Sequence, residues 1–284
     1  MNKKYYFFIP IITIFVILIT YYLLVPNKGN SLNPQNFIKV MDFNIGGFPI
    51  IHSPSIEEVV KIIQLENPDI VFLQDVGSIQ KLKKISSLSK LNYYLPQVVK
   101  KKSVSVAILA RFPLLFKKKL ILKNRKKITQ VIFGEISFKN RKLLLISTEL
   151  SNILLKVDRN GKLITNKARL LGIVLRETFL ENYRSKEAEQ LLHEIKKFKA
   201  DYIIMAGDFH SLPFSLAIRK IRANFKDCSW LNKSFFQSSI KTKFLFFPIK
   251  VDYIFVSNNL ECSGTKILQE SPNDHFPIVT NIAF

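Results

Sequence analysis

The sequence contains little cysteine. Its two cysteines, Cys228 and Cys262, lie far apart and lack the close spacing of metal-binding or redox pairs. A zinc ribbon and a CxxC redox motif are therefore excluded. The two thiols are expected to be buried separately or, if the domain lies outside the cytoplasm, to form one disulfide. The sequence leaves both open, because bridging depends on the Cα separation.

Acidic residues are also scarce. There are 21 of them against 43 lysines and arginines, which gives a formal net charge of +22. Such a positive potential favours a polyanionic partner, either nucleic acid or an anionic lipid surface. The lysines are spread along the chain in runs such as residues 100–102 and 117–119, so solvated faces or a composition bias are the alternative explanation.

Charged residues are absent from residues 5–25, which read YYFFIPIITIFVILITYYLLV. About 20 apolar residues match the thickness of a bilayer core, and tyrosines at both ends suit its two interfaces. A cleaved signal peptide is the alternative, but its apolar stretch should be shorter and end at a small-residue site. Lys3 and Lys4 precede the run and favour a cytoplasmic N-terminus. We predict a single-pass transmembrane signal-anchor (1–25), a linker (26–36) and an extracytoplasmic domain (37–284).

The remainder lacks internal repeats and low-complexity segments, and it is long enough for one large domain with a full core. Short apolar runs alternate with helical stretches, which predicts an α/β or α+β fold. The expected strands are Ile38–Asn44, Ile70–Gln74, Ser105–Ala110, Val131–Phe138, Lys142–Thr148, Tyr202–Ala206 and Val251–Ser257. The expected helices are Ser55–Glu66, which opens with a Ser-x-x-Glu capping box, Lys167–Tyr183 and Ser185–Phe198.

Polar side chains gather where these apolar strands end. They are Asp42, Asn44, Gln74, Asp75, Thr148, Glu149, Asp208, His210, Asp252, Asp274 and His275. Strand ends are where a rigid scaffold presents catalytic groups. Carboxylate and amide oxygens suit hard cations such as Mg²⁺ or Mn²⁺, and an imidazole beside carboxylates suits proton handling or phosphate contact. Each residue alone is as well explained by a turn or a helix cap, but the joint pattern predicts a metal-assisted phosphoryl site.

Seven segments along the chain resemble, in order, the strand-end motifs of the endonuclease/exonuclease/phosphatase superfamily. They are VMDFNIGG, NPDIVFLQDV, SVAILARFPL, LLLISTEL, DYIIMAGDFH, VDYIFVSN and SPNDHFPIV. The resemblance covers Ile38 to the C-terminus. It implies a four-layer sandwich of two packed mixed β-sheets flanked by helices, with the site at one end of the sheets. It also implies a Mg²⁺- or Mn²⁺-dependent hydrolase of phosphodiester bonds, either a nuclease or a phospholipid phosphodiesterase.

The resemblance carries over to single positions. On the metal side, Asn44 resembles the family asparagine, Asp75 stands at the metal-binding glutamate, and Asp274 matches the aspartate beside the histidine. Asp208 matches the aspartate that orients or deprotonates the attacking water. Asp252 and His275 match the family's Asp–His pair.

Three positions depart from the family pattern. Asp75 replaces a glutamate, Glu149 replaces the histidine of Thr-His-Leu, and His210 replaces the asparagine of Gly-Asp-Phe-Asn. A carboxylate about 4 Å from a phosphate oxygen costs roughly 4 kcal/mol at an effective dielectric near 20. One hypothesis is that Glu149 pairs with His210 and keeps it cationic, and another is that the two recruit a second metal. The alternative function is a catalytically impaired, membrane-anchored module that binds polyanions.

Overall fold

The computed structural model describes residues 37–46, 53–96, 103–123, 128–152, 167–231, 237–241 and 249–284. The elements in chain order are β1 (Phe37–Asn44), α2 (Ile56–Glu66), β2 (Ile70–Gly77), α3 (Ile79–Ser89), β3 (Tyr93–Leu95), β4 (Val104–Ala110), β5 (Leu115–Lys123), β6 (Ile128–Phe138), β7 (Arg141–Glu149), α4 (Lys167–Phe179), α5 (Tyr183–Ile195), β8 (Tyr202–Asp208), α6 (Leu216–Arg222), β9 (Lys226–Asp227), α7 (Cys228–Leu231), β10 (Asp252–Val256), β11 (Glu261–Ile267) and β12 (Ile278–Ala283).

Every strand and helix expected from the sequence is present, with changed ends. Ser55 caps α2 in the expected capping box. The helix expected over Lys167–Tyr183 ends earlier, at Phe179, and the next one begins at Tyr183 instead of Ser185. The reason is Asn182, whose side chain accepts a hydrogen bond from the backbone N–H of Ser185 and thereby starts α5.

Two six-stranded sheets form the centre of the domain. The first has the order β11-β12-β1-β2-β4-β3, and the second has the order β5-β6-β7-β8-β10-β9. In each sheet one central pair is parallel, β1 with β2 and β7 with β8, while the other pairs are antiparallel. Both sheets are therefore mixed, as predicted.

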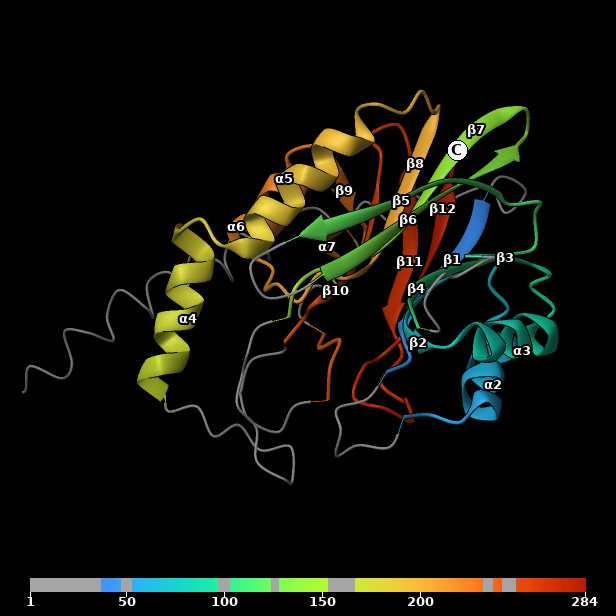
Figure 1. The fold of residues 1–284 in the computed structure, drawn as a ribbon, viewed down its shortest axis with the longest axis horizontal. Coiled ribbons are helices and arrows are strands. Elements are labelled where there is room, and N and C mark those ends of the chain that lie inside the picture. The colour runs from blue at the N-terminus through green and yellow to red at the C-terminus, as the bar shows by residue number, and fades with distance from the viewer. Residues whose placement is uncertain are drawn as a thin grey trace, which may run out of the picture.

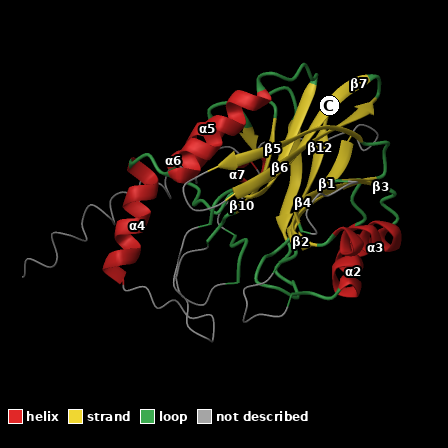
Figure 2. Cartoon of the chain, viewed as in Figure 1, coloured by secondary structure: helices red, strands yellow, loops and turns green. Residues whose placement is uncertain are grey.

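Helices cover the outer faces of both sheets (Figures 1 and 2). The first sheet packs against α2 and α3 through a core that includes Met41, Phe43, Val59 and Ile85. The second sheet packs against α5 and α6 through a separate core around Phe209. A third core lies between the sheets. The predicted four-layer sandwich is confirmed.

The core between the sheets turns polar at one end. In β1, Ile38 and Val40 point into this core, and the alternation of strand side chains places Asp42 and Asn44 on the same face. The same alternation places Asp208, after Ile204 and Ala206 in β8, on the face between the sheets. Asp252 occupies the corresponding face of β10, before Ile254 and Val256. At this end of the sandwich, the inward-facing positions of the strands are therefore occupied by polar residues instead of apolar ones.

A disulfide joins the two sheets at one side. Cys228 begins α7, directly after the edge strand β9, and Cys262 lies in the edge strand β11 of the other sheet. Their sulfurs are bonded, and their Cα atoms lie 5.3 Å apart. Of the two states that the sequence left open for these cysteines, the structure contains the disulfide.

The predicted membrane span at residues 5–25 and the linker at 26–36 lie outside the described residues. Among the helices in the described ranges, none has the length and apolarity needed to cross a bilayer. The anchor stays a prediction from the sequence.

Candidate active site

Asp208 is fully buried at the end of β8 and is contacted from both sheets. The side-chain amide of Asn44, at the end of β1, donates to Asp208 Oδ2 at 3.1 Å. His210 contributes twice, because its backbone N–H donates to Asp208 Oδ1 at 2.8 Å and its Nε2 lies 3.3 Å from Oδ2. Nε2 of His275 lies 3.8 Å from the same oxygen. Asp208 is therefore held in one orientation by an amide and two imidazoles.

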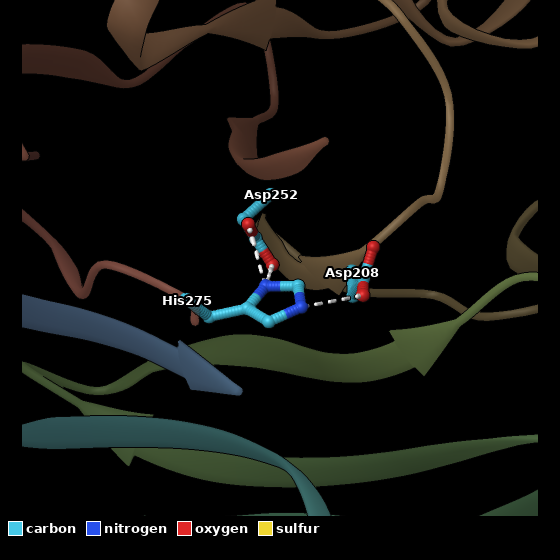
Figure 3. A group of neighbouring side chains, drawn as sticks. All are labelled: Asp208, Asp252 and His275. Carbon is cyan, nitrogen blue, oxygen red and sulfur yellow. Dashed lines mark hydrogen bonds and ion pairs between the residues drawn. The ribbon is translucent and has the colours of Figure 1, made fainter. Parts of the chain in front are cut away.

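Asp252 and His275 form the predicted pair. Nδ1 of His275 lies 3.1 Å from each carboxylate oxygen of Asp252, and the ring points its Nε2 toward Asp208 (Figure 3). The three side chains come from β8, from the start of β10 and from the loop before β12. Their convergence confirms that residues separated by 67 positions of sequence meet at one point.

Burial and neighbouring charges shift the protonation of this group. Burial alone lowers the pKa of His275, but the carboxylates of Asp252, Asp208 and Asp274 raise it to about 10. Burial raises the pKa of Asp208 to about 8, with a further increase from Asp252, against the opposing effect of His275. At neutral pH the imidazole is therefore cationic and carries a proton on both nitrogens.

Asp42 adds a further buried carboxyl that the sequence named only as a strand-end residue. Its Oδ1 accepts a hydrogen bond from Nε2 of Gln74 at 2.8 Å, across the parallel β1–β2 pair. Burial, followed by repulsion from Asp252, raises the pKa of Asp42 well above its usual range. In the sequence Asp42 was marked only by its place near the end of a strand.

Asp75 lies at the rim, on the exposed side of β2, with a left-handed φ of 53°. Gly46 packs directly against it, because a Cβ at Gly46 would lie 2.4 Å from the Asp75 Cβ. The backbone N–H of Gly46 donates to Asn44 Oδ1 at 2.9 Å. The turn after β1 therefore brings Asn44 and Asp75 to the same end of the first sheet.

The sequence model of the Endonuclease/Exonuclease/phosphatase family matches residues 43–275. This chain belongs to the Endonuclease/Exonuclease/phosphatase family. Comparison with curated protein sequences gave no match. The family assignment rests on the match of the family model over residues 43–275.

Solved structures share the fold at low sequence identity. D. rerio TDP2 complexed with single strand DNA product superposes with a TM-score of 0.62 at 14% identity, over 87% of this chain and 99% of that one. The endonuclease/exonuclease/phosphatase from Bacteroides vulgatus gives a TM-score of 0.61 at 14% identity, over 87% and 99%. TDP2 from C. elegans gives 0.59 at 16% identity, over 90% and 78%. At such identities these likenesses support the fold alone.

The residues of this family member fit a divalent cation. Asp274 is 6% exposed, and its Oδ1 has no hydrogen-bond partner within the described part of the chain. A buried carboxylate oxygen without a donor is what a hard cation would satisfy. One group of three acidic or histidine side chains, Asp208, Asp252 and His275, also has ligand atoms within 4.8 Å of one another. The resemblance to the family assigns the cation to Asn44, Asp75 and Asp274, and this assignment stays a prediction.

The departures from the family pattern also lie at this end. Glu149 ends β7 and pairs with Asp208 in the parallel β7–β8 ladder, and its side chain is half-buried. His210 follows β8 with a left-handed φ of 46°. The contact with Asp208 places His210 in the site, while the pairing of Glu149 with His210 stays a prediction.

Two buried polar residues that sequence reasoning missed hold the site together. Ser239 Oγ accepts hydrogen bonds from the backbone N–H groups of Val251 and Asp252, at 2.9 and 3.1 Å. Asn273 binds the turn after β1. Neither residue has a local signature, because each bonds to backbone that is distant in sequence.

Proposed function

We propose that this domain hydrolyses phosphodiester bonds with the help of a divalent cation. The observation that carries the proposal is the environment of Asp208, which is buried, fixed by Asn44 and His210, and faced by an imidazole that Asp252 orients. A fixed carboxylate opposite a fixed cationic ring can direct a water molecule at one face of a phosphate while the ring contacts its oxygens.

The side chains have separable roles in this reaction. Asp208 in its ionised form accepts the proton of the attacking water, and its raised pKa of about 8 makes that form a stronger base than an ordinary carboxylate. His275 donates to a phosphoryl oxygen, and Asp252 keeps the ring in place. A cation held by Asn44, Asp75 and Asp274 would supply further neutralisation of phosphoryl charge. The water oxygen bonds to phosphorus as its proton passes to Asp208, and the ester P–O bond breaks. The leaving oxygen takes up a proton from solvent, and Asp208 later returns its proton to solvent.

Nucleic acid is the substrate class that we favour. The net charge of +22 gives long-range attraction to a polyanion. D. rerio TDP2, which has the same fold, was solved with a single strand DNA product. Both points also allow other polyanions, so the position of the site relative to the predicted anchor matters.

An anchor at residues 5–25 would join the domain at Phe37, at the opposite end of β1 from the site. The linker ends where β1 begins, at Phe37, and β1 reaches the site only at Asn44. Eight strand residues span roughly 23 Å at about 3.3 Å per residue. A domain tethered at Phe37 would therefore hold its site away from the point of attachment. This arrangement favours a soluble polyanion over lipid head groups.

The test is hydrolysis by the full chain in detergent or nanodiscs. The substrates are bis-p-nitrophenyl phosphate, single-stranded DNA and RNA, and phospholipid vesicles, each with Mg²⁺ or Mn²⁺. We expect metal-dependent turnover of DNA or RNA that Asp208→Asn reduces at least about a thousandfold. Glu57→Gln, in the exposed first turn of α2, is the matched control and should retain full activity. Turnover of vesicles alone would overturn the substrate class, and turnover unaffected by Asp208→Asn would overturn the site.

A binding module for polyanions is the second candidate, and Glu149 is the observation that favours it. Glu149 pairs with Asp208 in the parallel β7–β8 ladder, in the place of a family histidine. If repulsion by Glu149 prevents hydrolysis, the wild-type chain should bind DNA in a salt-dependent manner without cleaving it. Activity that appears only in the Glu149→His, His210→Asn double variant would support this candidate.

A further inference from the structure

Asn273 ties the C-terminal motif to the turn after β1. Its side-chain amide nitrogen donates to the carbonyl oxygens of Asn44 and Gly46, both at 2.7 Å. Its Oδ1 accepts the hydroxyl hydrogen of Ser271 at 2.6 Å. Asn273 is 0% exposed. Both amide hydrogens are used, so the orientation of this amide is set by its partners.

The two carbonyls that Asn273 binds flank Ile45 and define the shape of the turn. Ile45 is buried, and its N–H donates to the Gln74 carbonyl at 3.0 Å. Gly46 in turn lies against Asp75, with no room for a side chain between them. A movement of this turn would therefore shift Asp75 as well as Asn44.

Asn273 also directly precedes Asp274 in the chain. The buried Asn273 is thus linked to all three residues that we assign to the cation. Its amide binds the carbonyls of Asn44 and Gly46, Gly46 contacts Asp75, and a peptide bond joins Asn273 to Asp274. By contrast, Ser239 holds the backbone of Asp252 and belongs to the other half of the site.

We propose that Asn273 is a positioning residue that sets the spacing of Asn44, Asp75 and Asp274 for a divalent cation. This inference rests on the proposed function. It extends that function because it assigns the positioning of the three cation-binding residues to a side chain that contacts no substrate. An asparagine is required for a chemical reason. Aspartate at the same place would turn an oxygen toward two carbonyl oxygens, and serine is too short to reach both.

The test separates metal binding from catalysis in the full chain in detergent. Mn²⁺ binding is measured by calorimetric titration without substrate, and hydrolysis of bis-p-nitrophenyl phosphate is measured across Mn²⁺ concentrations. We expect Asn273→Asp and Asn273→Ala to raise the Mn²⁺ dissociation constant at least tenfold. The Mn²⁺ concentration for half-maximal activity should rise in parallel, and kcat at saturating Mn²⁺ should return to within about threefold of wild type.

Ser239→Ala is the matched control, because it removes a buried hydrogen-bonding hydroxyl from the other half of the site. It should lower kcat at every Mn²⁺ concentration while the Mn²⁺ dissociation constant stays unchanged. Denaturant unfolding in EDTA reports any general loss of stability. Asn273 variants that lose stability but keep the wild-type Mn²⁺ dissociation constant would overturn the proposal.

Ser271→Ala provides a milder variant in case both Asn273 variants fail to fold. It removes only the hydrogen bond to Asn273 Oδ1, and we expect a smaller rise of the Mn²⁺ dissociation constant in the same direction. An unchanged constant would count against the proposal. Wild-type protein that neither binds Mn²⁺ nor turns over substrate would instead defeat the proposed function itself, so the two failures are distinguishable.

Discussion

Nδ1 of His275 lies 3.1 Å from both carboxylate oxygens of Asp252, which leaves Nε2 as the ring atom that faces Asp208. The carboxylate thereby selects which nitrogen is available to a ligand. The Asp252 carboxylate limits rotation of the imidazole, and Ser239 holds the backbone of Asp252.

Asp252→Asn tests this orientation. Asparagine offers the Nδ1–H group of His275 one neutral carbonyl oxygen in place of two carboxylate oxygens, so the ring loses its fixed orientation and its raised pKa. We expect kcat to fall about a hundredfold or more, with a small change in KM, in steady-state assays on bis-p-nitrophenyl phosphate. Asp201→Asn, at the exposed end before β8, serves as control. A large rise in KM at constant kcat would contradict the assigned role.

The stability of the metal-free domain should fall as pH rises. The folded pKa of His275, about 10, lies above its ordinary value of 6.5. Its contribution to the free energy of unfolding is thus fully present below about pH 6.5 and is lost as pH rises through 10. The raised pKa of Asp208, about 8, acts in the same direction between pH 4 and 8. Denaturant unfolding in EDTA should show this decline, and His275→Gln should flatten it. A profile that rises from pH 6 to 9 would be evidence against the ion pair.

Lys250 should reduce stability, and replacing it should stabilise the domain. Its Nζ is fully buried, 4.0 Å from Asp227 Oδ1 and 3.4 Å from the centre of the Tyr253 ring, and it has no hydrogen-bond partner among the described residues. Burial lowers the pKa of Lys250 to about 8, against the opposing effect of Asp227.

We expect Lys250→Met to raise the free energy of unfolding at pH 7 by about 1–3 kcal/mol. Asp227 keeps Arg222 as its ion-pair partner, so no carboxylate is left uncompensated. The wild-type penalty is present below pH 8 and vanishes toward pH 10.5, so the gain should shrink over that range. Lys84→Met, at an exposed salt bridge, should change stability by less than about 0.5 kcal/mol. A destabilised Lys250→Met would show that the ammonium is net favourable.

Gly207 requires the absence of a side chain. It precedes Asp208 with a φ of 153°, and a Cβ there would lie 1.8 Å from the Thr148 carbonyl oxygen in β7. Gly207→Ala must therefore push β7 and β8 apart, and we expect a loss of at least about 2 kcal/mol in denaturant unfolding. Gly172→Ala, in α4 with nothing within 4 Å, should instead stabilise the helix by up to about 1 kcal/mol. Equal effects of the two variants would be inconsistent with this close contact.

The disulfide should contribute to stability through the chain segment that it closes. Cys228 and Cys262 are separated by 34 residues, for which loop closure predicts about 3–4 kcal/mol. The Cys228→Ala, Cys262→Ala double variant should lose this amount in denaturant unfolding, while wild-type protein should lose it only after reduction. If wild-type protein showed no change on reduction, the bond would not form in solution.

The strands that carry the site were predictable because each combines an apolar run with a polar end, as in β1 and β8. The helix α3 was not, because its lysines and serines dilute the apolar spacing, although Ser78 caps it. Edge strand β11 was missed for a similar reason, since the sequence Cys-Ser-Gly-Thr within it favours a turn.

The residues of the site also differ in whether the sequence predicts them. Asp208, Asp252 and His275 were predictable from motifs, and the structure brings them together. Asn273 and Ser239 were not, because their partners are backbone atoms of distant segments. Asn273 binds atoms 227 and 229 positions away. Hydrogen bonds to a remote backbone leave no periodicity in the sequence, so only coordinates reveal them.

Asp75 and His210 both sit in left-handed backbone, with φ of 53° and 46°. Asparagine, aspartate and histidine are the residues other than glycine that adopt this conformation most readily. Replacing Asp75 or His210 by another of these three residue types changes the charge and the metal preference with little conformational penalty. A β-branched residue, in contrast, would strain the chain there. Substitutions among these three residue types at Asp75 and His210 would therefore change the ligand chemistry of the site and leave the surrounding backbone in place.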